Sequence, residues 1–332
     1  MDNLTHTAVG LFLSRLGLNR WTPAATPILL LAANAPDIDI VTLAGGPVSY
    51  LHYHRHLTHS LAAMPVLALA AVALVRFAGR RPVRWAGAFA AALIGVASHL
   101  LLDLTNVYGV RLLLPFSGEW QRLDTTSIVD LCIWAILLMG VAAPFLGRLV
   151  GGEITSGKAK FRHYGRGGAI FALTLVLLYD CARGVFHQRA VAVLQARLYQ
   201  GAEPARVAAM PNPANPLLWR GLVETDDFYA VEDVNLTTDF DPMRAAIFHK
   251  AEPDPAIGAA RDTAAFRVFL SFSQFPLWRV LPIPDPENGK AVSVLDMRFG
   301  SPVSPGFAAT AIVDARNRVL RTSVRWGSSQ PR

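Results

Sequence analysis

The sequence contains few charged residues. Only 17% of its 332 residues are Asp, Glu, Lys or Arg, and 52% are hydrophobic, whereas a soluble globular domain carries about 25% charged residues. The shortage argues against an ordinary soluble protein and favours one that lies largely in a membrane. The formal net charge of +7 is then more naturally a signal of membrane topology than a footprint for nucleic acid, and we expect no nucleic-acid partner.

Cysteine is also scarce. The two cysteines, Cys132 and Cys181, lie inside apolar runs, so we expect neither a disulfide nor a cysteine-based zinc site. The chain lacks a Gly-x-Ser-x-Gly element, which argues against a serine nucleophile. Its first residues lack the basic opening and the small-residue cleavage site of a signal peptide, and we expect them to be retained.

Long apolar runs occur at four places, and each approximates one bilayer crossing. They cover residues 60–77, 85–102, 127–147 and 168–185. Two shorter apolar pieces, at 4–19 and 23–35, precede them. These two predict either a re-entrant hairpin, which must be buried among other helices, or an amphipathic helix followed by a buried one. We therefore predict an α-helical integral membrane domain of four long spans plus an N-terminal pair of short helices.

The loops between these runs differ in charge. Residues 76–84 and 148–166 are basic, whereas residues 103–126 carry more acids than bases. The positive-inside rule places the two basic loops in the cytoplasm. The histidine-rich loop at 52–59, residues 103–126 and everything after residue 186 then lie outside. We expect a multi-pass protein of a bacterial inner membrane, in contact with the lipid bilayer, whose C-terminal domain is extracytoplasmic.

The character of the sequence changes after residue 186. We predict a membrane-embedded domain at 1–186, a helical exit with a proline-rich linker at 187–217, and a small β-rich extramembrane domain at 218–328. Short segments of β character, separated by Pro, Gly, Asn and Asp, indicate strands at 218–224, 228–236, 266–272, 292–299, 308–314 and 319–326. The sequence from Asp314 to Arg318, between the last two segments, is typical of a hairpin turn.

Histidines gather at the entrance of the first long run. Four of them fall within eight residues, and a helix beginning near Thr58 would put His56 and His59 one turn apart on one side. His99 and Asp103 are four residues apart near the end of the second long run, so they share a helix face. If the two helices are antiparallel neighbours, the histidines of both lie at the same membrane surface.

Two aspartates follow Pro36. Asp37 and Asp39 share a side only in extended or turn structure; alternatively, Asp37 caps a helix at 38–44. With the histidines, these acids give a set of candidate metal ligands that can reach one membrane surface: His6, Asp37, Asp39, His56, His59, His99 and Asp103. Imidazoles and carboxylates without thiolates suit a divalent metal, Zn²⁺ first and Mn²⁺ or Fe²⁺ as alternatives. The set exceeds one tetrahedral site and allows two ions.

A two-metal site can clamp the attacking and leaving oxygens of a phosphoester displacement and acidify a bound water. Metal-activated water is therefore the expected nucleophile. Glu119 is a candidate base or further ligand, and Asp130 is a candidate to orient a ligating histidine. Asn106, Tyr108 and Arg111 are candidates to contact a substrate anion. In the alternative, each of these is an ordinary loop or helix-end residue.

The motifs also resemble a known family in their order and spacing. They are His6, Pro36-Asp37-Ile38-Asp39, His56-Leu57-Thr58-His59-Ser60 and His99-Leu100-Leu101-Leu102-Asp103. Over about residues 1–185 they resemble the YdjM-like family of bacterial inner-membrane proteins, and the resemblance implies a metal-dependent hydrolase. We expect a membrane-bound enzyme that cleaves a phosphoester of lipid or envelope origin. The alternatives are a non-enzymatic, metal-stabilised scaffold that binds an envelope partner, and a transporter, which the position of the ionisable residues near run ends argues against.

Overall fold

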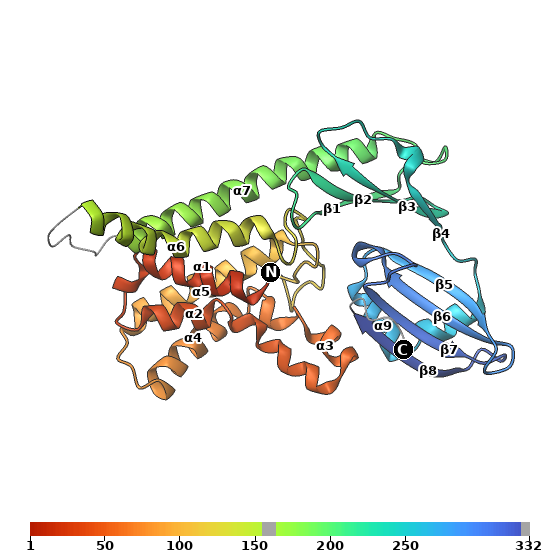
Figure 1. Cartoon of the computed structure of the whole chain (residues 1–332). Helices are drawn as coiled ribbons and strands as arrows, with labels where there is room; N and C mark the ends of the chain where they lie inside the picture. The colour runs from red at the N-terminus through yellow and green to blue at the C-terminus, as the bar shows by residue number, and fades with distance from the viewer. Residues whose placement is uncertain (155–163, 327–332) are drawn as a thin grey trace. The chain divides into compact units, whose positions relative to one another are not determined.

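The structure, a computed structural model, describes residues 1–154 and 164–326 (Figure 1). The chain divides into two compact units, which we call the helical unit and the β unit. The helical unit comprises Met1–Asp39, Arg55–Gln188 and Pro211–Leu217. The β unit comprises Ile40–His54, Arg189–Met210 and the chain from Leu218 onward.

The first half of the chain folds into helices joined by short turns. The α-helices are α1 (Asn3–Leu16), α2 (Ala25–Ala32), α3 (Pro47–Tyr53), α4 (Met64–Ala73), α5 (Trp85–Thr105), α6 (Leu131–Ile154) and α7 (Tyr164–Gln195). Three 3₁₀-helices and one π-helix lie between these described α-helices. The 3₁₀-helices are η1 (Leu18–Arg20), η2 (Ala35–Gly45) and η3 (Leu57–His59), and the π-helix is η4 (Leu74–Ala78). The predicted pair of short N-terminal helices is present as α1 and α2.

The helix α5 packs against α1, α2 and α4. Glycine permits its close approach to α2: a Cβ added to Gly95 would lie 2.9 Å from the Cβ of Ala32. A Cβ added to Gly10 of α1 would lie 2.9 Å from the carbonyl oxygen of Leu29 in α2. Small residues at helix crossings let backbones approach in this way. The ends of three helices are thereby held together near the predicted metal ligands.

Among the residues that the structure describes, two helices, α5 and α7, are long and apolar enough to cross a membrane. Two bent pairs, α2 with η2 and the helices at 47–59 with those at 64–78, raise the number to four if each pair is one span. The predicted count of four long spans is therefore not confirmed, although two of the predicted runs fall in α5 and α7.

In the other two runs the α-helix begins later than the run does. The run at 60–77 does not begin a helix near Thr58, because η3 ends at His59 and α4 begins only at Met64. The run at 127–147 falls in α6, which begins at Leu131.

The β unit contains two four-stranded sheets whose strands follow sequence order, with antiparallel pairing. One sheet is β1 (Arg206–Pro211), β2 (Leu218–Glu224), β3 (Phe228–Asn235) and β4 (Ala246–His249). The other is β5 (Pro276–Ile283), β6 (Gly289–Asp296), β7 (Phe307–Val313) and β8 (Val319–Trp326). Two helices, α8 (Pro255–Arg261) and α9 (Ala264–Phe272), lie between them in sequence. The predicted turn at Asp314 joins β7 to β8, and the Asp314 carboxylate accepts the backbone N–H groups of Arg316 and Arg318.

One predicted strand is wrong. The segment 266–272 belongs to the helix α9, which the Thr263 side chain caps by accepting the backbone N–H of Phe266. Phe266, Phe269 and Phe272 are all buried, and their spacing of three residues fits the buried face of a helix. The structure also adds strands that were not predicted: β1, in the stretch expected as a linker, β4 and β5. The strand predicted at 292–299 ends at Asp296, where a 3₁₀ turn begins.

Candidate metal centre

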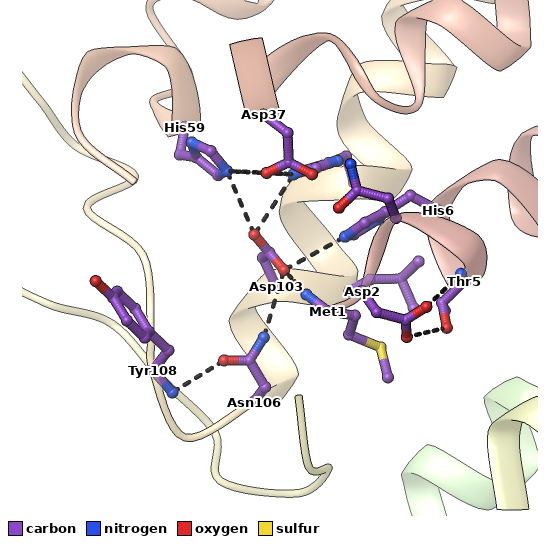
Figure 2. Close-up of polar contacts among 12 residues, drawn as sticks. Met1, Asp2, Thr5, His6, Asp37, His59, Asp103, Asn106 and Tyr108 are labelled. Carbon is purple, nitrogen blue, oxygen red and sulfur yellow. Dashed lines mark hydrogen bonds and ion pairs between the residues drawn. The ribbon is translucent and has the colours of Figure 1, made fainter. Parts of the chain in front are cut away.

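The helix α5 carries the first two members of the centre. His99 and Asp103, four residues apart, lie on one face, and both side chains are fully buried. His59 reaches them from η3 and Asp37 reaches them from η2 (Figure 2). His59 is also fully buried, whereas the Asp37 side chain is 17% exposed and forms the open edge of the cluster.

The two aspartates bring carboxylate oxygens close to the facing nitrogens of the two histidines. The Nε2 atoms of His59 and His99 are 3.2 Å apart. The Asp103 Oδ2 atom is 3.4 Å from each of them. The Asp37 Oδ1 atom is 3.5 Å from His59 Nε2 and 3.7 Å from His99 Nε2. In a tetrahedral zinc site with ligands about 2.0–2.2 Å from the ion, neighbouring ligand atoms are about 3.3–3.6 Å apart. His59, His99 and Asp103 have the spacing of three such ligands, and Asp37 faces the two histidines but belongs to another group of facing donors.

The contacts on the far side of each imidazole indicate its tautomer. The Nδ1 atom of His99 lies 2.7 Å from the carbonyl oxygen of Ala33, which can only accept a hydrogen bond. The Nδ1 atom of His59 lies 3.4 Å from Asp39 Oδ2 and 3.1 Å from Thr58 Oγ1. With the protons assigned to Nδ1 on these contacts, both Nε2 atoms present lone pairs to each other. Such an arrangement is unfavourable by itself, and a bound cation relieves it.

His6 of α1 lies beside this group. Its ring stacks on the ring of His99, with centroids 3.7 Å apart, and its Nε2 atom is 3.5 Å from Asp103 Oδ1. Burial lowers the pKa of His6 well below its usual value, which keeps the imidazole neutral and able to bind a metal. His6, Asp37 and His99 form a second group of facing donor atoms, in addition to His59, His99 and Asp103.

Several polar atoms of the cluster lack a hydrogen-bond partner within the part of the chain that the structure describes. They are both ring nitrogens of His6, Asp37 Oδ2 and Asp103 Oδ2. Leaving a buried polar atom unsatisfied costs about 1–3 kcal/mol. Asp103 Oδ2 is one of the facing donor atoms, and a divalent metal bound there would satisfy it.

The structure places the other predicted ligands differently. Asp39 lies behind His59, where its carboxylate faces Nδ1 and accepts the backbone N–H of Arg55 at 2.8 Å. His56 is half-buried at the start of η3 and belongs to neither group of facing donors.

Of the residues predicted to contact a substrate anion or to act as a base, Asn106 contacts a proposed ligand. Asn106 donates to Asp103 Oδ1 at 3.3 Å, and its own Oδ1 accepts the backbone N–H of Tyr108. Arg111 lies over the ring of Trp120, away from the ligand atoms. Glu119 is exposed.

Asp130 does not orient a ligating histidine. Its carboxylate caps the start of α6 by accepting the backbone N–H groups of Cys132 and Ile133, and it also accepts the hydroxyl of Tyr179.

Arg55 is the residue of the site that the sequence did not single out. It is only 4% exposed, its Nη2 atom donates to Asp103 Oδ1 at 2.9 Å, and its guanidinium lies over the ring of Tyr108. Its backbone has a φ of 54°, in the left-handed region that non-glycine residues rarely adopt. The amine of Met1 donates to the same oxygen of Asp103. A basic residue between two histidines was the only signal in the sequence, and it is equally typical of an exposed loop.

A cluster of buried histidines and aspartates at the ends of apolar helices defines a class: a multi-helix membrane protein with a candidate metal centre. The comparisons agree. The sequence model of the YdjM inner membrane protein family matches residues 1–190, so the chain belongs to this family and the resemblance noted in its motifs is confirmed. It is also similar to the uncharacterized protein YfhP of Bacillus subtilis (strain 168), with 25% identity over 155 residues. That alignment covers 44% of this chain and about half, 47%, of YfhP. No solved structure matches the chain.

Proposed function

We propose that this protein is a membrane-embedded, metal-dependent hydrolase. The observation that carries the proposal is the set of facing donor atoms of His59, His99 and Asp103, whose separations of 3.2–3.4 Å fit three ligands of a tetrahedral ion. Asp37 Oδ1, 3.5–3.7 Å from the two histidine nitrogens, is the fourth candidate ligand. The membrane-embedded location is supported by the match of the chain to the YdjM inner membrane protein family. Zn²⁺ is the ion that we propose first, because its tetrahedral sites take imidazole and carboxylate ligands.

Each residue then has a definite task. His59, His99, Asp37 and Asp103 would hold the ion, which when bound lowers the pKa of water and stabilises negative charge on oxygen. Asp39 and the Ala33 carbonyl hold the two imidazoles with Nε2 toward the ion. Such contacts behind metal ligands raise ligand basicity and fix ring orientation. The burial of the centre excludes bulk water and strengthens every electrostatic interaction within it.

The proposed substrate is a phosphoester of lipid or envelope origin. Asp37 is the exposed edge of the cluster, and its neighbour Ile38 is 58% exposed. An apolar rim beside a polar centre suits an amphipathic molecule whose headgroup reaches the ligands while its chain stays in the bilayer. The candidate centre thus favours a lipid phosphoester over a freely soluble one.

The proposed topology follows from charge. The basic loop at 76–84 faces the cytoplasm, as does the loop at 148–166, of which residues 155–163 lie outside the described part. The β unit is extracytoplasmic. In this arrangement the metal centre opens toward the outer surface.

Two substitutions test the hydrolase. His99→Ala removes a ligand from a helix that packing holds, and Asp103→Asn keeps the shape while removing charge. Full-length protein in detergent would be assayed against a generic phosphodiester and extracted envelope lipids, with added Zn²⁺ or Mn²⁺ and with Cys181→Ser, an exposed change in α7, as the control. We expect both ligand variants to lose metal and turnover and the control to keep both. Turnover that survives in both ligand variants would refute the proposal.

The burial of the centre supports one other function, a structural metal in a scaffold that binds an envelope partner. Three of the four proposed ligands are fully buried, and closed sites are typical of structural zinc. If the wild type binds metal but hydrolyses nothing, and both variants melt far lower, the scaffold is the better description.

A further inference from the structure

The number of ions in the centre follows from the way its donors are shared, and this inference rests on the metal centre of the proposed function. We propose that the centre holds a single divalent cation and that the guanidinium of Arg55 occupies the position of a second. A two-metal site, which the number of candidate ligands allows, would need two complete sets of donors. The part of the chain that the structure describes provides only one complete set.

The first limit is His99. His99 belongs to both groups of facing donors. One group adds His6 and Asp37 to it, and the other adds His59 and Asp103. Its Nδ1 atom is engaged by the carbonyl oxygen of Ala33 at 2.7 Å, so only Nε2 is left as a ligand. One imidazole nitrogen has one lone pair and binds one ion. The two groups therefore cannot be filled at the same time.

The second limit is Asp103. A carboxylate that bridges two ions uses one oxygen for each. Here Oδ2 faces His59 and His99, whereas Oδ1 receives Arg55 Nη2, Asn106 Nδ2 and the Met1 amine. The positively charged guanidinium of Arg55 and the amide of Asn106 therefore already lie on the side where a second ion would have to approach.

The surroundings of the Arg55 guanidinium are those that a hard cation prefers. Its Nη1 atom donates to the side-chain oxygen of Asn106 at 3.0 Å and to the carbonyl oxygen of Gly109 at 3.1 Å, and Nη2 donates to Asp103 Oδ1 at 2.9 Å. A carboxylate, an amide and a backbone carbonyl form the kind of oxygen set that binds Mn²⁺ or Ca²⁺ elsewhere. Arginine fills it here with a cation that is part of the chain.

The charge of the side chains points the same way. The three carboxylates of Asp37, Asp39 and Asp103 carry three negative charges. One guanidinium and one divalent ion balance them, and a second divalent ion would leave an excess of two positive charges. Uncompensated charge in a buried site is strongly unfavourable. Arg55 also links two of the acids, since its backbone N–H donates to Asp39 while its guanidinium donates to Asp103.

The test counts ions in full-length protein in detergent. The protein is equilibrated with Mn²⁺, desalted, and analysed by mass spectrometry of the elements and by electron paramagnetic resonance. We expect one ion per wild-type chain, with the spectrum of an isolated Mn²⁺. Arg55→Ala opens the oxygen set and should bind two ions with a spin-coupled spectrum, whereas Arg55→Lys keeps the charge and should bind one.

Two ions in the wild type, or one in Arg55→Ala, would overturn the proposal. If Arg55→Ala does not fold, the wild-type count and spectrum still decide. No ion in the wild type would refute the metal centre itself, and with it the hydrolase. A count of two would leave the hydrolase intact, because turnover is measured separately.

Discussion

The substitution Asp39→Asn tests whether Asp39 orients His59, as the structure indicates, or binds the metal itself, as the sequence pattern suggested. In the structure the Asp39 carboxylate faces Nδ1 of His59 at 3.4 Å and does not face the ion. Asparagine keeps the shape and can still accept the backbone N–H of Arg55, which donates to Asp39 at 2.8 Å. The change therefore removes charge behind the histidine without removing a ligand.

The expected loss is modest. Removing a partner behind a metal ligand lowers affinity by about 10–100-fold, which is about 1.4–2.7 kcal/mol. The Thr58 hydroxyl, 3.1 Å from the same Nδ1 atom, still holds the ring in the variant. We therefore expect a loss near the lower end, about tenfold, and a much greater loss for His59→Ala, which deletes the ligand.

The assay is competition for Zn²⁺ against a chromophoric chelator, with purified protein in detergent. Glu119→Gln provides a matched control, because it makes the same carboxylate-to-amide change at an exposed residue, and its affinity should stay within about twofold of the wild type, as is usual for surface changes. An unchanged affinity in Asp39→Asn would refute the orienting role. A loss as great as that of His59→Ala would show that Asp39 is itself a ligand, as the sequence suggested.

Three further predictions concern stability and topology. Zn²⁺ at about 100 times its Kd should stabilise the protein by about 2.7 kcal/mol, so a chelator should lower the Tm of the wild type and leave His99→Ala unchanged; equal shifts would contradict the site. Reporter fusions after Arg80 and after Trp326 should report cytoplasm and exterior respectively, and cytoplasmic activity at Trp326 would reverse the orientation. In the β unit, burial raises the pKa of Glu224, but hydrogen bonds from Lys250 and Arg206 outweigh burial and leave it below its usual value. The stabilisation by Glu224 is therefore present above the pKa of the unfolded chain, about 4.3, and lost as the pH falls below it. Glu224→Gln should melt lower at pH 7 and show a smaller acid-induced fall in Tm, and parallel melting profiles would rule out this contribution.

The sequence predicts those parts of the centre in which the residues that act together are close in the chain. His99 and Asp103 could be paired because helix periodicity places residues four apart on one face. Helix periodicity could not show which of His56 and His59 faces the metal centre. His56 precedes the 3₁₀ turn with a ψ of −127°, so it does not share the face of His59. Arg55 escaped notice because its role depends on a left-handed backbone and on partners 48 to 54 residues away.

The β unit shows a limit of composition. The segment 266–272 is rich in aromatic and branched residues, which are typical of strands, yet its phenylalanines at every third position pack as a helix face. The strand β1 ends in proline and β5 begins with one, and the proline-rich composition around β1 predicts a linker there. Both strands have positions where a ladder tolerates proline, which composition alone does not reveal.

The end of α2 explains why the Asn-Ala-Pro-Asp turn lies where it does. A helix leaves the carbonyls of its last turn without intrahelical partners, and Pro36 has no N–H to extend the hydrogen bonding. The carbonyl of Ala33, the C-cap of α2, is therefore available, and His99 uses it to fix the position of its Nδ1 atom. Asp37, the residue after the proline, then lies close enough to face the other nitrogen of the same ring at 3.7 Å. A single helix end thus supplies both the group that orients one ligand and the next ligand, because the chain stops being α-helical between Ala33 and Asp37.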